Sequence, residues 1–406
     1  MLLCTGDRGV GGVAKYNHAL LCALASKGYR VTCLQPQAVD TDAVTARQQL
    51  GIRHLWFEDS QTQAAISHIL NTPSERPHLI ISSNTSPFSN LDIQAAAIAF
   101  GIPFIIIEGL VSTEYIKRET PQRIEQLAQH YTKAKTTIAV SQANLNLLHE
   151  FYGLPRDRGQ VIHYGRPSQY FIPKDMQRRN RLRQSLNIPN DAIVCFTSAR
   201  IETRKGYHYQ LEAIQALMAT PIWDRLYFVW AGGGIFRPEL ETQLKEALQQ
   251  MGIADKVKFL GQVPDVAEWL DLADIFVLPS QDEGMPLSAI EAMAKGLSII
   301  ATAVGGIPEA LGNTGRLILD PKADAQGTIT ELTQAIQELA MQPELRHQLA
   351  QAAKQRAQNL FTEHRMLEET IAVIENALLP DGDYVSPGLQ IIQPDRCFPK
   401  YDRGRH

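Results

Sequence analysis

The chain has 406 residues, of which 44% are hydrophobic and 20% are charged, and its formal net charge is −4. These values are typical of a globular protein long enough for two domains. They exclude the overall positive charge by which many nucleic-acid-binding proteins hold the phosphate backbone. No apolar run reaches the roughly 18 residues of a membrane-spanning helix, and the first residues lack the pattern of a signal peptide.

The five cysteines are scattered along the chain, and no pair has the spacing of metal ligands. This pattern predicts reduced, mostly buried thiols and a cytoplasmic protein. The cysteines are Cys4, Cys22, Cys33, Cys195 and Cys397.

In the first half of the chain, short apolar runs alternate with segments of helical periodicity. One helix is predicted over Ala14–Lys27, with Gly28 as its C-terminal stop. Strands are predicted at Val31–Leu34, His54–Phe57, His78–Ser82, Phe104–Ile107, Thr137–Val140 and Gln160–His163.

Residues 165–190 interrupt this pattern with glycine, proline and a charged run from Lys174 to Arg183. The basic cluster at 178–183 predicts the solvated face of a connecting helix, with contact to an acidic surface as the alternative. The break therefore separates two domains.

The second half repeats the alternation, and residues 324–379 follow as helices without strands. Strands are predicted at Ile193–Ser198, Leu226–Trp230, Val257–Leu260, Ile275–Leu278, Ser298–Ala301 and Arg316–Leu319. Strands separated by helix-length segments predict parallel sheets, so we expect an α/β protein of two Rossmann-like, doubly wound domains. We place these domains at 1–165 and 166–362, and predict an extended tail at 380–406.

The most informative motif, EGMPLSAIEAMAKG at 283–296, places Glu283 and Glu291 eight residues apart. Glu283 follows a predicted strand, and Glu291 falls in a helix that begins near Pro286. Open α/β sheets bind ligands at this edge, and a helix N-terminus favours anionic groups. Both carboxylates can accept hydrogen bonds from sugar hydroxyls. The alternative is an ordinary strand–loop–helix with surface glutamates.

A second motif, SARIETRKG at 198–206, follows a predicted strand and opens a helix at Tyr207. Arg200 and Lys205 would flank a phosphate site there, since Arg offers a planar fork of donors and Lys a compact charge. The start of a helix also favours an anionic group, so this position suits a phosphate. Solvated charges at a helix start are the alternative, and Arg204 is predicted to point to solvent.

The N-terminal loop satisfies the dinucleotide pattern G-x-G-x-x-A at residues 9, 11 and 14. However, the second predicted strand ends in Leu34-Gln35-Pro36-Gln37, without the acidic residue that binds the ribose in nicotinamide enzymes. A nicotinamide enzyme is therefore disfavoured.

Together these motifs resemble those of the retaining GT-B glycosyltransferases of family GT4, and Gly305-Gly306-Ile307-Pro308-Glu309 continues the resemblance. The resemblance covers the chain to about residue 379. It implies a first domain that binds the acceptor and a second that binds a nucleotide sugar. It also implies a last helix, at 363–379, that crosses back to the first domain.

The resemblance also implies a role for each matched residue. Arg200 and Lys205 would stabilise the leaving diphosphate and Glu283 would orient the donor sugar, so these three form the predicted catalytic group. Glu291 would hold the ribose. The remaining predicted donor-binding residues are Gly11, Gly12, Gly233, Val263, Gly284, Met285, Pro286 and Leu287.

Two segments depart from the family pattern. Glu108 stands where many relatives carry a histidine, and His163-Tyr164-Gly165-Arg166 replaces the usual proline–asparagine–glycine turn. Glu108, His163 and Arg166 are the predicted acceptor-side residues. Contact with the donor sugar and a structural role are the alternatives for Glu108, and a structural role is the alternative for His163.

The predicted activity is transfer of a hexosyl group with retention, from a UDP-sugar or GDP-mannose, to a glycan, lipid-linked sugar or sugar phosphate. No metal or cofactor and no nucleic-acid partner is expected. The protein would be cytoplasmic, with peripheral contact at the inner face of a membrane left open. The alternatives are an epimerase or phosphorylase on the same fold, and a binding protein that has lost turnover.

Overall fold

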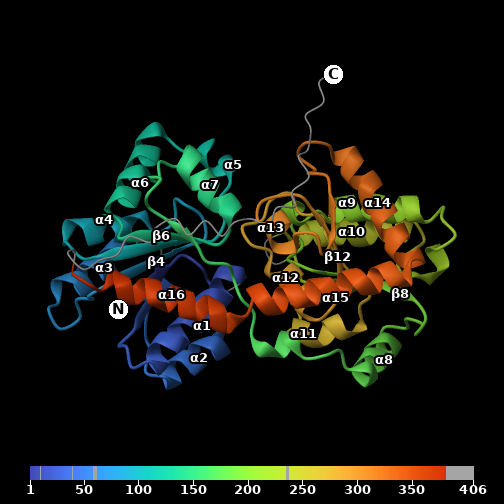
Figure 1. The fold of residues 1–406 in the computed structure, drawn as a ribbon, viewed down its shortest axis with the longest axis horizontal. Helices are drawn as coiled ribbons and strands as arrows, with labels where there is room; N and C mark the ends of the chain where they lie inside the picture. The colour runs from blue at the N-terminus through green and yellow to red at the C-terminus, as the bar shows by residue number, and fades with distance from the viewer. Residues whose placement is uncertain (10, 39, 58–61, 235–236, 381–406) are drawn as a thin grey trace.

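The structure is a computed structural model that describes residues 1–9, 11–38, 40–57, 62–234 and 237–380. Two lobes, each built around one sheet, lie side by side (Figure 1). Every pair of neighbouring strands in both sheets is parallel, so the predicted fold class is confirmed. The predicted tail lies outside the described residues, apart from Pro380, and so does Cys397.

The sheet of the first lobe has seven strands in the order β3-β2-β1-β4-β5-β6-β7. The central strand β1 was not among the predicted strands, because its four residues are all buried and show no alternation. The strands are β1 (Leu2–Thr5), β2 (Thr32–Pro36), β3 (Arg53–Phe57), β4 (Ile80–Asn84), β5 (Phe104–Glu108), β6 (Thr136–Ala139) and β7 (Gln160–Val161).

Helices cover both faces of this sheet, as Figure 1 shows with α1 and α2 on one side and α4 and α6 on the other. Successive side chains of a strand point to opposite faces. Ile105 and Ile107 accordingly join the core under α1, whereas Phe104 and Ile106 join the core under α4 and α6. The helices are α1 (Gly12–Ser26), α2 (Thr41–Gln49), α3 (Thr62–Asn71), α4 (Leu91–Ala99), α5 (Thr113–Ile116), α6 (Pro121–Lys133) and α7 (Gln142–Phe151).

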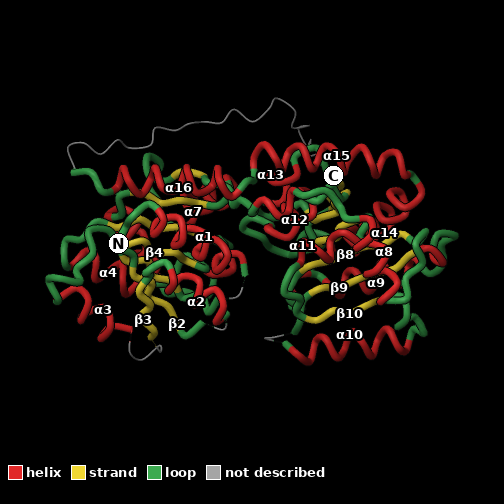
Figure 2. The backbone as a smooth tube through the Cα atoms, turned by 90° about the horizontal axis from the view of Figure 1, so that it is seen from below, coloured by secondary structure: helices red, strands yellow, loops and turns green. Residues whose placement is uncertain are grey.

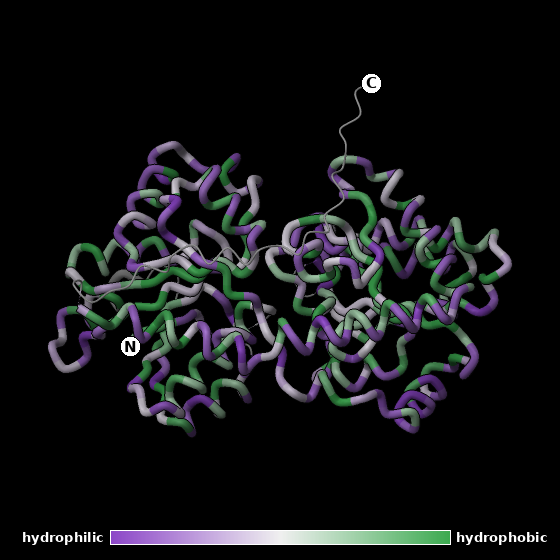
Figure 3. Tube along the Cα trace, in the orientation of Figure 1, coloured by the Kyte–Doolittle hydropathy of each residue, from purple (hydrophilic) through white to green (hydrophobic). Residues whose placement is uncertain are grey.

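The sheet of the second lobe has six strands in the order β10-β9-β8-β11-β12-β13. Figure 2 shows β8, β9 and β10 of this sheet side by side. In the first lobe, Figure 3 shows apolar residues where Figure 1 places the central strands. The strands are β8 (Ile193–Ser198), β9 (Leu226–Ala231), β10 (Val257–Gly261), β11 (Ile275–Leu278), β12 (Ser298–Thr302) and β13 (Arg316–Ile318). The helices are α9 (Tyr207–Leu217), α10 (Pro238–Gln250), α11 (Val266–Trp269), α12 (Leu287–Ala294), α13 (Ile307–Leu311), α14 (Ala325–Met341) and α15 (Pro343–Leu360).

Within residues 1–380, the described part of the chain passes between the lobes twice, and these two passages pair with each other. The backbone N–H of Arg166 donates to the carbonyl of Phe361 at 2.8 Å, and the N–H of Glu363 donates to the carbonyl of Arg166 at 2.9 Å. The final helix α16 (Glu363–Ala377) then lies against α1 of the first lobe (Figure 1). A buried hydrogen bond of 3.1 Å between the hydroxyls of Tyr16 and Thr370 joins these two helices.

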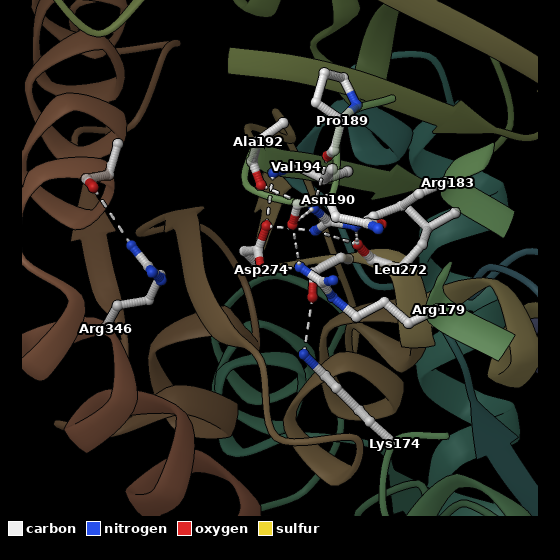
Figure 4. A network of polar contacts seen from close by, with 12 residues as sticks. Lys174, Arg179, Arg183, Pro189, Asn190, Ala192, Val194, Leu272, Asp274 and Arg346 are labelled. Carbon is white, nitrogen blue, oxygen red and sulfur yellow. Dashed lines mark hydrogen bonds and ion pairs between the residues drawn. The ribbon is translucent and has the colours of Figure 1, made fainter. Parts of the chain in front are cut away.

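The basic cluster lies in α8 (Met176–Ser185), and its last arginine is not solvated as predicted. The Arg183 side chain is fully buried and donates to the carboxylate of Asp274 at 2.7 Å and to the carbonyl of Leu272 (Figure 4). Burial lowers the pKa of Arg183, although Asp274 opposes that shift. The guanidinium fastens α8 to the second sheet, since Asp274 directly precedes β11.

Replacing Arg183 with methionine should lower the free energy of unfolding by about 2–4 kcal/mol, because the partly buried carboxylate of Asp274 and several carbonyls would lose their donor. Urea unfolding would measure the change. Arg181→Met is the matched control, since Arg181 is exposed on the same helix and should change stability by no more than about 0.5 kcal/mol. Equal stabilities of the two variants would contradict the anchoring role.

Candidate functional site

A cleft of about 570 Å³ lies where the carboxyl ends of both sheets face each other. From the first lobe it is lined by Asp7, Gly11, Gly12, Val13, Lys15, Thr85, Ser86, Gly109, Leu110, Tyr115 and by Tyr164 of the passage. From the second lobe it is lined by Ser198, Ala199, Arg200, Glu202, Arg204, Lys205, Ala231, Gly232, Gln262, Val263, Val266, Glu283, Gly284, Met285, Pro286, Leu287, Ser288 and Glu291.

Most of the predicted site residues therefore come together in one cleft. All of the predicted catalytic residues line it, and so do all of the predicted donor-binding residues except Gly233, whose neighbour Gly232 takes that place. The sequence did not single out Lys15, Tyr115, Thr85 or Ser86. These residues could have been found from the topology, because each follows a strand of the first sheet or lies in the first turn of the helix after that strand.

The loop that carries Glu283 is held by hydrogen bonds from two other loops. The N–H of Gln281 donates to the carbonyl of Arg204 at 2.8 Å, and the hydroxyl of Thr302 donates to the carbonyl of Ser280 at 2.6 Å. Gly305 has a left-handed backbone with φ of 51°, and a Cβ there would lie 1.8 Å from the carbonyl oxygen of Glu283. Only glycine lets the two loops approach this closely.

The carboxylate of Glu283 is almost fully buried and carries its own positive partners. Its Oε1 accepts from Lys205 Nζ at 2.6 Å and from the Ser280 hydroxyl at 2.7 Å. Burial would raise the pKa of Glu283, but the charges of Lys205 and Arg204 outweigh it and the pKa is lowered. Burial in turn lowers the pKa of Lys205 against the pull of Glu283. An anionic carboxylate and a cation thus lie side by side at the start of α9.

Arg204 does not point to solvent, which corrects the prediction for this residue. It lines the cleft and donates to the carbonyl of Asp282 at 2.6 Å, and its Nη1 lies 3.8 Å from Glu283 Oε2. Arg200, one third exposed, forms an ion pair of 2.9 Å with Glu202. Three cations therefore surround the part of the cleft at the α9 N-terminus, where an anionic ligand group is favoured.

Glu291 lies one turn into α12 and is only 2% exposed. Its Oε1 lies 3.1 Å from Lys15 Nζ, in the first turn of α1, and 2.9 Å from Arg166 Nε, in the passage between the lobes. The positive partners of Glu283 belong to the second lobe, whereas those of Glu291 lie in the first lobe and in the passage between the lobes.

Glycines bring the two lobes into close contact at the floor of the cleft. A Cβ on Gly284 would lie 2.0 Å from the carbonyl oxygen of Gly109, and one on Gly12 would lie 3.1 Å from Leu287 Cδ1. The predicted glycine turn of the first lobe and the motif loop of the second therefore touch directly.

Glu108, predicted on the acceptor side, is fully buried behind the cleft lining. Its Oε1 accepts from Asn84 Nδ2 at 2.9 Å and from the Tyr131 hydroxyl at 2.8 Å. Burial raises the pKa of Glu108 to about 7, although these two hydrogen bonds oppose the shift. The contacts favour the structural alternative for this residue.

His163 and Arg166 are not among the residues that line the cleft, and their side chains contact other protein groups. These contacts do not support an acceptor role. His163 Nε2 lies 2.5 Å from Glu309 Oε1, and Glu309 Oε2 accepts from the N–H of Gln142 at 2.7 Å. Glu309 belongs to the second lobe, whereas Gln142 opens α7 of the first. The segment that departs from the family pattern thus joins the lobes.

The described residues contain no group of three histidine, cysteine, aspartate or glutamate side chains arranged to hold a metal ion. No helix in this part of the chain is long and apolar enough to cross a membrane.

Two family models match the chain in tandem and leave few residues between them. The model for Glycosyltransferase Family 4 matches residues 10–169, and the model for Glycosyl transferases group 1 matches residues 178–356. The first match covers the lobe with α1, and the second contains both motif carboxylates.

Curated relatives are about a quarter to a third identical to this chain over the segments that align. The D-inositol 3-phosphate glycosyltransferase of Streptomyces coelicolor is 27% identical over 320 residues, which cover 75% of this chain and 62% of that protein. The mannosylfructose-phosphate synthase of Agrobacterium fabrum is 30% identical over 278 residues, covering 66% and 59%. The chain thus spans about six tenths of the length of these relatives.

Solved structures show the same architecture. Anabaena Alr3699/HepE in complex with UDP superposes with a TM-score of 0.78 at 18% identity, covering 92% of this chain and 99% of that one. Sucrose-phosphate synthase from Thermosynechococcus elongatus gives a TM-score of 0.71 at 19% identity, covering 92% and 98%. At these identities the likeness establishes the fold alone, which is GT-B.

Gly284→Ala should lower the free energy of unfolding by about 1–3 kcal/mol, because the new Cβ would overpack the contact between the lobes. Urea unfolding would measure this loss. Gly6→Ala is the control, since the nearest atom to its Cβ would lie 3.9 Å away. An unchanged midpoint for Gly284→Ala would contradict the close approach of the lobes.

Glu108→Gln should flatten the pH dependence of stability between about pH 4.5 and 7. In the wild type the unfolded chain releases this proton near 4.5 and the folded chain near 7, so the free energy of unfolding falls by roughly 3 kcal/mol across that window. Below it the carboxyl is protonated in both states. Urea unfolding at several pH values would measure both curves, and parallel curves would contradict the shifted pKa.

Proposed function

Because the chain belongs to the group 1 glycosyltransferases of family GT4, we propose that it is a retaining glycosyltransferase. It would transfer a sugar from a nucleotide-sugar donor to a hydroxyl acceptor. The observation that carries this proposal is the cleft itself, in which Arg200, Lys205, Glu283 and Glu291 of the second lobe face the first lobe. Cations for a diphosphate and carboxylates for hydroxyls are the groups that a nucleotide sugar requires.

The proposed reaction breaks the bond between the anomeric carbon and the diphosphate oxygen. The electron pair goes to the leaving diphosphate, where Arg200 and Lys205 stabilise the growing negative charge. The acceptor hydroxyl forms its bond on the same face of the sugar, and its proton passes to the leaving phosphate oxygen. The configuration is thereby retained without an enzyme nucleophile.

Glu283 would orient the donor sugar by accepting hydrogen bonds from its hydroxyls. Lys205 and Ser280 already hold its Oε1, so the carboxylate needs little reorganisation when the sugar binds. Glu291 would accept from the ribose, and the backbone around Gly232 and Val263 would approach the base. Contact between the lobes would exclude water and suppress hydrolysis of the donor.

A UDP-sugar is the favoured donor, and GDP-mannose is the other candidate. The support comes from relatives of the same fold, since Alr3699/HepE is described in complex with UDP and with UDP-glucose. The proposed acceptor is a glycan, a lipid-linked sugar or a sugar phosphate, in line with the phosphate-containing names of both curated relatives. It would enter from the first lobe, beside Thr85, Ser86 and Tyr115.

A thermal-shift panel of UDP, GDP, ADP and their sugars, on the wild type and on Arg200→Ala, tests the donor site. A ligand at about 100 times its Kd should stabilise the native wild type by roughly 2.7 kcal/mol. Arg200→Ala should lose most of that shift, because the diphosphate loses a charged donor. Arg225→Ala is the control, since Arg225 lies just before β9 and not in the cleft.

The outcomes separate an enzyme from a binding protein. Slow hydrolysis of the stabilising nucleotide sugar without an acceptor would support turnover. Binding without any hydrolysis or transfer would favour the alternative of a degenerate nucleotide-sugar-binding protein. If no nucleotide raises the melting temperature of the wild type, the assignment of the diphosphate site is wrong.

A further inference from the structure

The proposed ribose-binding carboxylate is held by residues outside the lobe that carries it. Oε1 of Glu291 contacts Lys15 Nζ at 3.1 Å and Arg166 Nε at 2.9 Å. Lys15 is 276 positions away in the chain and belongs to the first lobe. Arg166 belongs to the passage between the lobes. A carboxylate with 2% exposure requires such partners, since an uncompensated charge at that depth is strongly disfavoured.

We propose that Lys15 and Arg166 are positioning residues for Glu291, and that they make recognition of the ribose depend on the contact between the two lobes. This inference rests on the proposed function, because it assumes that Glu291 binds the ribose of a nucleotide. It adds two residues to the nucleotide site, and neither of them would touch the nucleotide base or the diphosphate.

Arg166 is fixed from several directions, which sets the orientation of its guanidinium. Its backbone N–H and carbonyl pair with Phe361 and Glu363 of the returning passage. Its guanidinium carbon lies 4.7 Å from the ring centre of Tyr170. Burial lowers the pKa of Arg166, but Glu291, Tyr170 and Glu363 together outweigh burial and the pKa is raised. Arg166 is therefore a fixed cation in the passage between the lobes, within ion-pair distance of Glu291.

Lys15 is the more adaptable of the two partners. Its side chain is 46% exposed, and it lies in the first turn of α1, next to the Gly11–Gly12 turn that lines the cleft. Because α1 belongs to the first lobe, moving the lobes apart would withdraw this ammonium from Glu291. The apparent affinity for the ribose would then fall in proportion to the fraction of molecules whose lobes are in contact.

The test compares affinities for UDP, 2′-deoxy-UDP and 3′-deoxy-UDP in the wild type, Glu291→Gln, Lys15→Met and Arg166→Gln. A hydrogen bond from a ribose hydroxyl to a carboxylate should make the wild type prefer UDP over the weaker deoxy analogue by about tenfold or more. Glu291→Gln should reduce that preference severalfold. Lys15→Met and Arg166→Gln should reduce it in the same direction, because a misplaced carboxylate discriminates less well.

Lys27→Met is the matched control for Lys15→Met. Lys27 is also on the first lobe, at the end of α1, and pairs with Glu375 of α16 at 3.4 Å, far from the cleft residues. It should keep the wild-type preference. A purely structural role of Lys15 would weaken UDP and both analogues equally and leave the ratio unchanged.

An unchanged ratio in Lys15→Met would overturn the inference even if Arg166→Gln fails to fold, since Lys15 is half exposed and its replacement should be tolerated. This failure differs from failure of the proposed function. If Glu291→Gln alters the ratio and Lys15→Met does not, only the positioning role is wrong. If the wild type binds none of UDP, GDP and ADP, the proposed donor site is wrong.

Discussion

Glu283 and Glu291 of the second lobe are almost fully buried carboxylates, so each must have a positive charge beside it. The positions of the residues that supply these charges determine the arrangement of the site. Glu283 takes its partners from its own lobe, chiefly Lys205 at 2.6 Å. Glu291 takes its partners from Lys15 and Arg166, at 3.1 and 2.9 Å. The proposed sugar and diphosphate part of the site is thus formed within one lobe, whereas the carboxylate proposed to bind the ribose has partners from both lobes.

The glycines of the motifs serve the same arrangement. Gly305 lets one loop pack on the carbonyl of Glu283, and Gly284 lets the motif loop pack on the carbonyl of Gly109 in the opposite lobe. A side chain at either position would separate backbone segments that now touch. These glycines therefore let the loop that carries Glu283 pack closely on its own lobe on one side and on the first lobe on the other.

The sequence predicted the parts of the molecule that local pattern determines. The strand–loop–helix at β11 and α12, the helix start at Tyr207 and both parallel sheets follow from buried runs, turn residues and helix periodicity. The strand β1 was missed because four buried residues at the start of a chain carry no period. Arg204 was placed in solvent because its partner, the carbonyl of Asp282, lies 78 positions further along the chain.

The contacts between the lobes could not be predicted in the same way, because they join residues that no local pattern relates. His163 meets Glu309 across 146 positions, and Lys15 meets Glu291 across 276. The segment 163–166 is predicted on the acceptor side because it departs from the family pattern. In the structure, His163 and Arg166 of this segment contact two carboxylates of the second lobe, those of Glu309 and Glu291. We therefore expect substitutions in this segment to change how the two lobes pack against each other, because its side chains join residues of both.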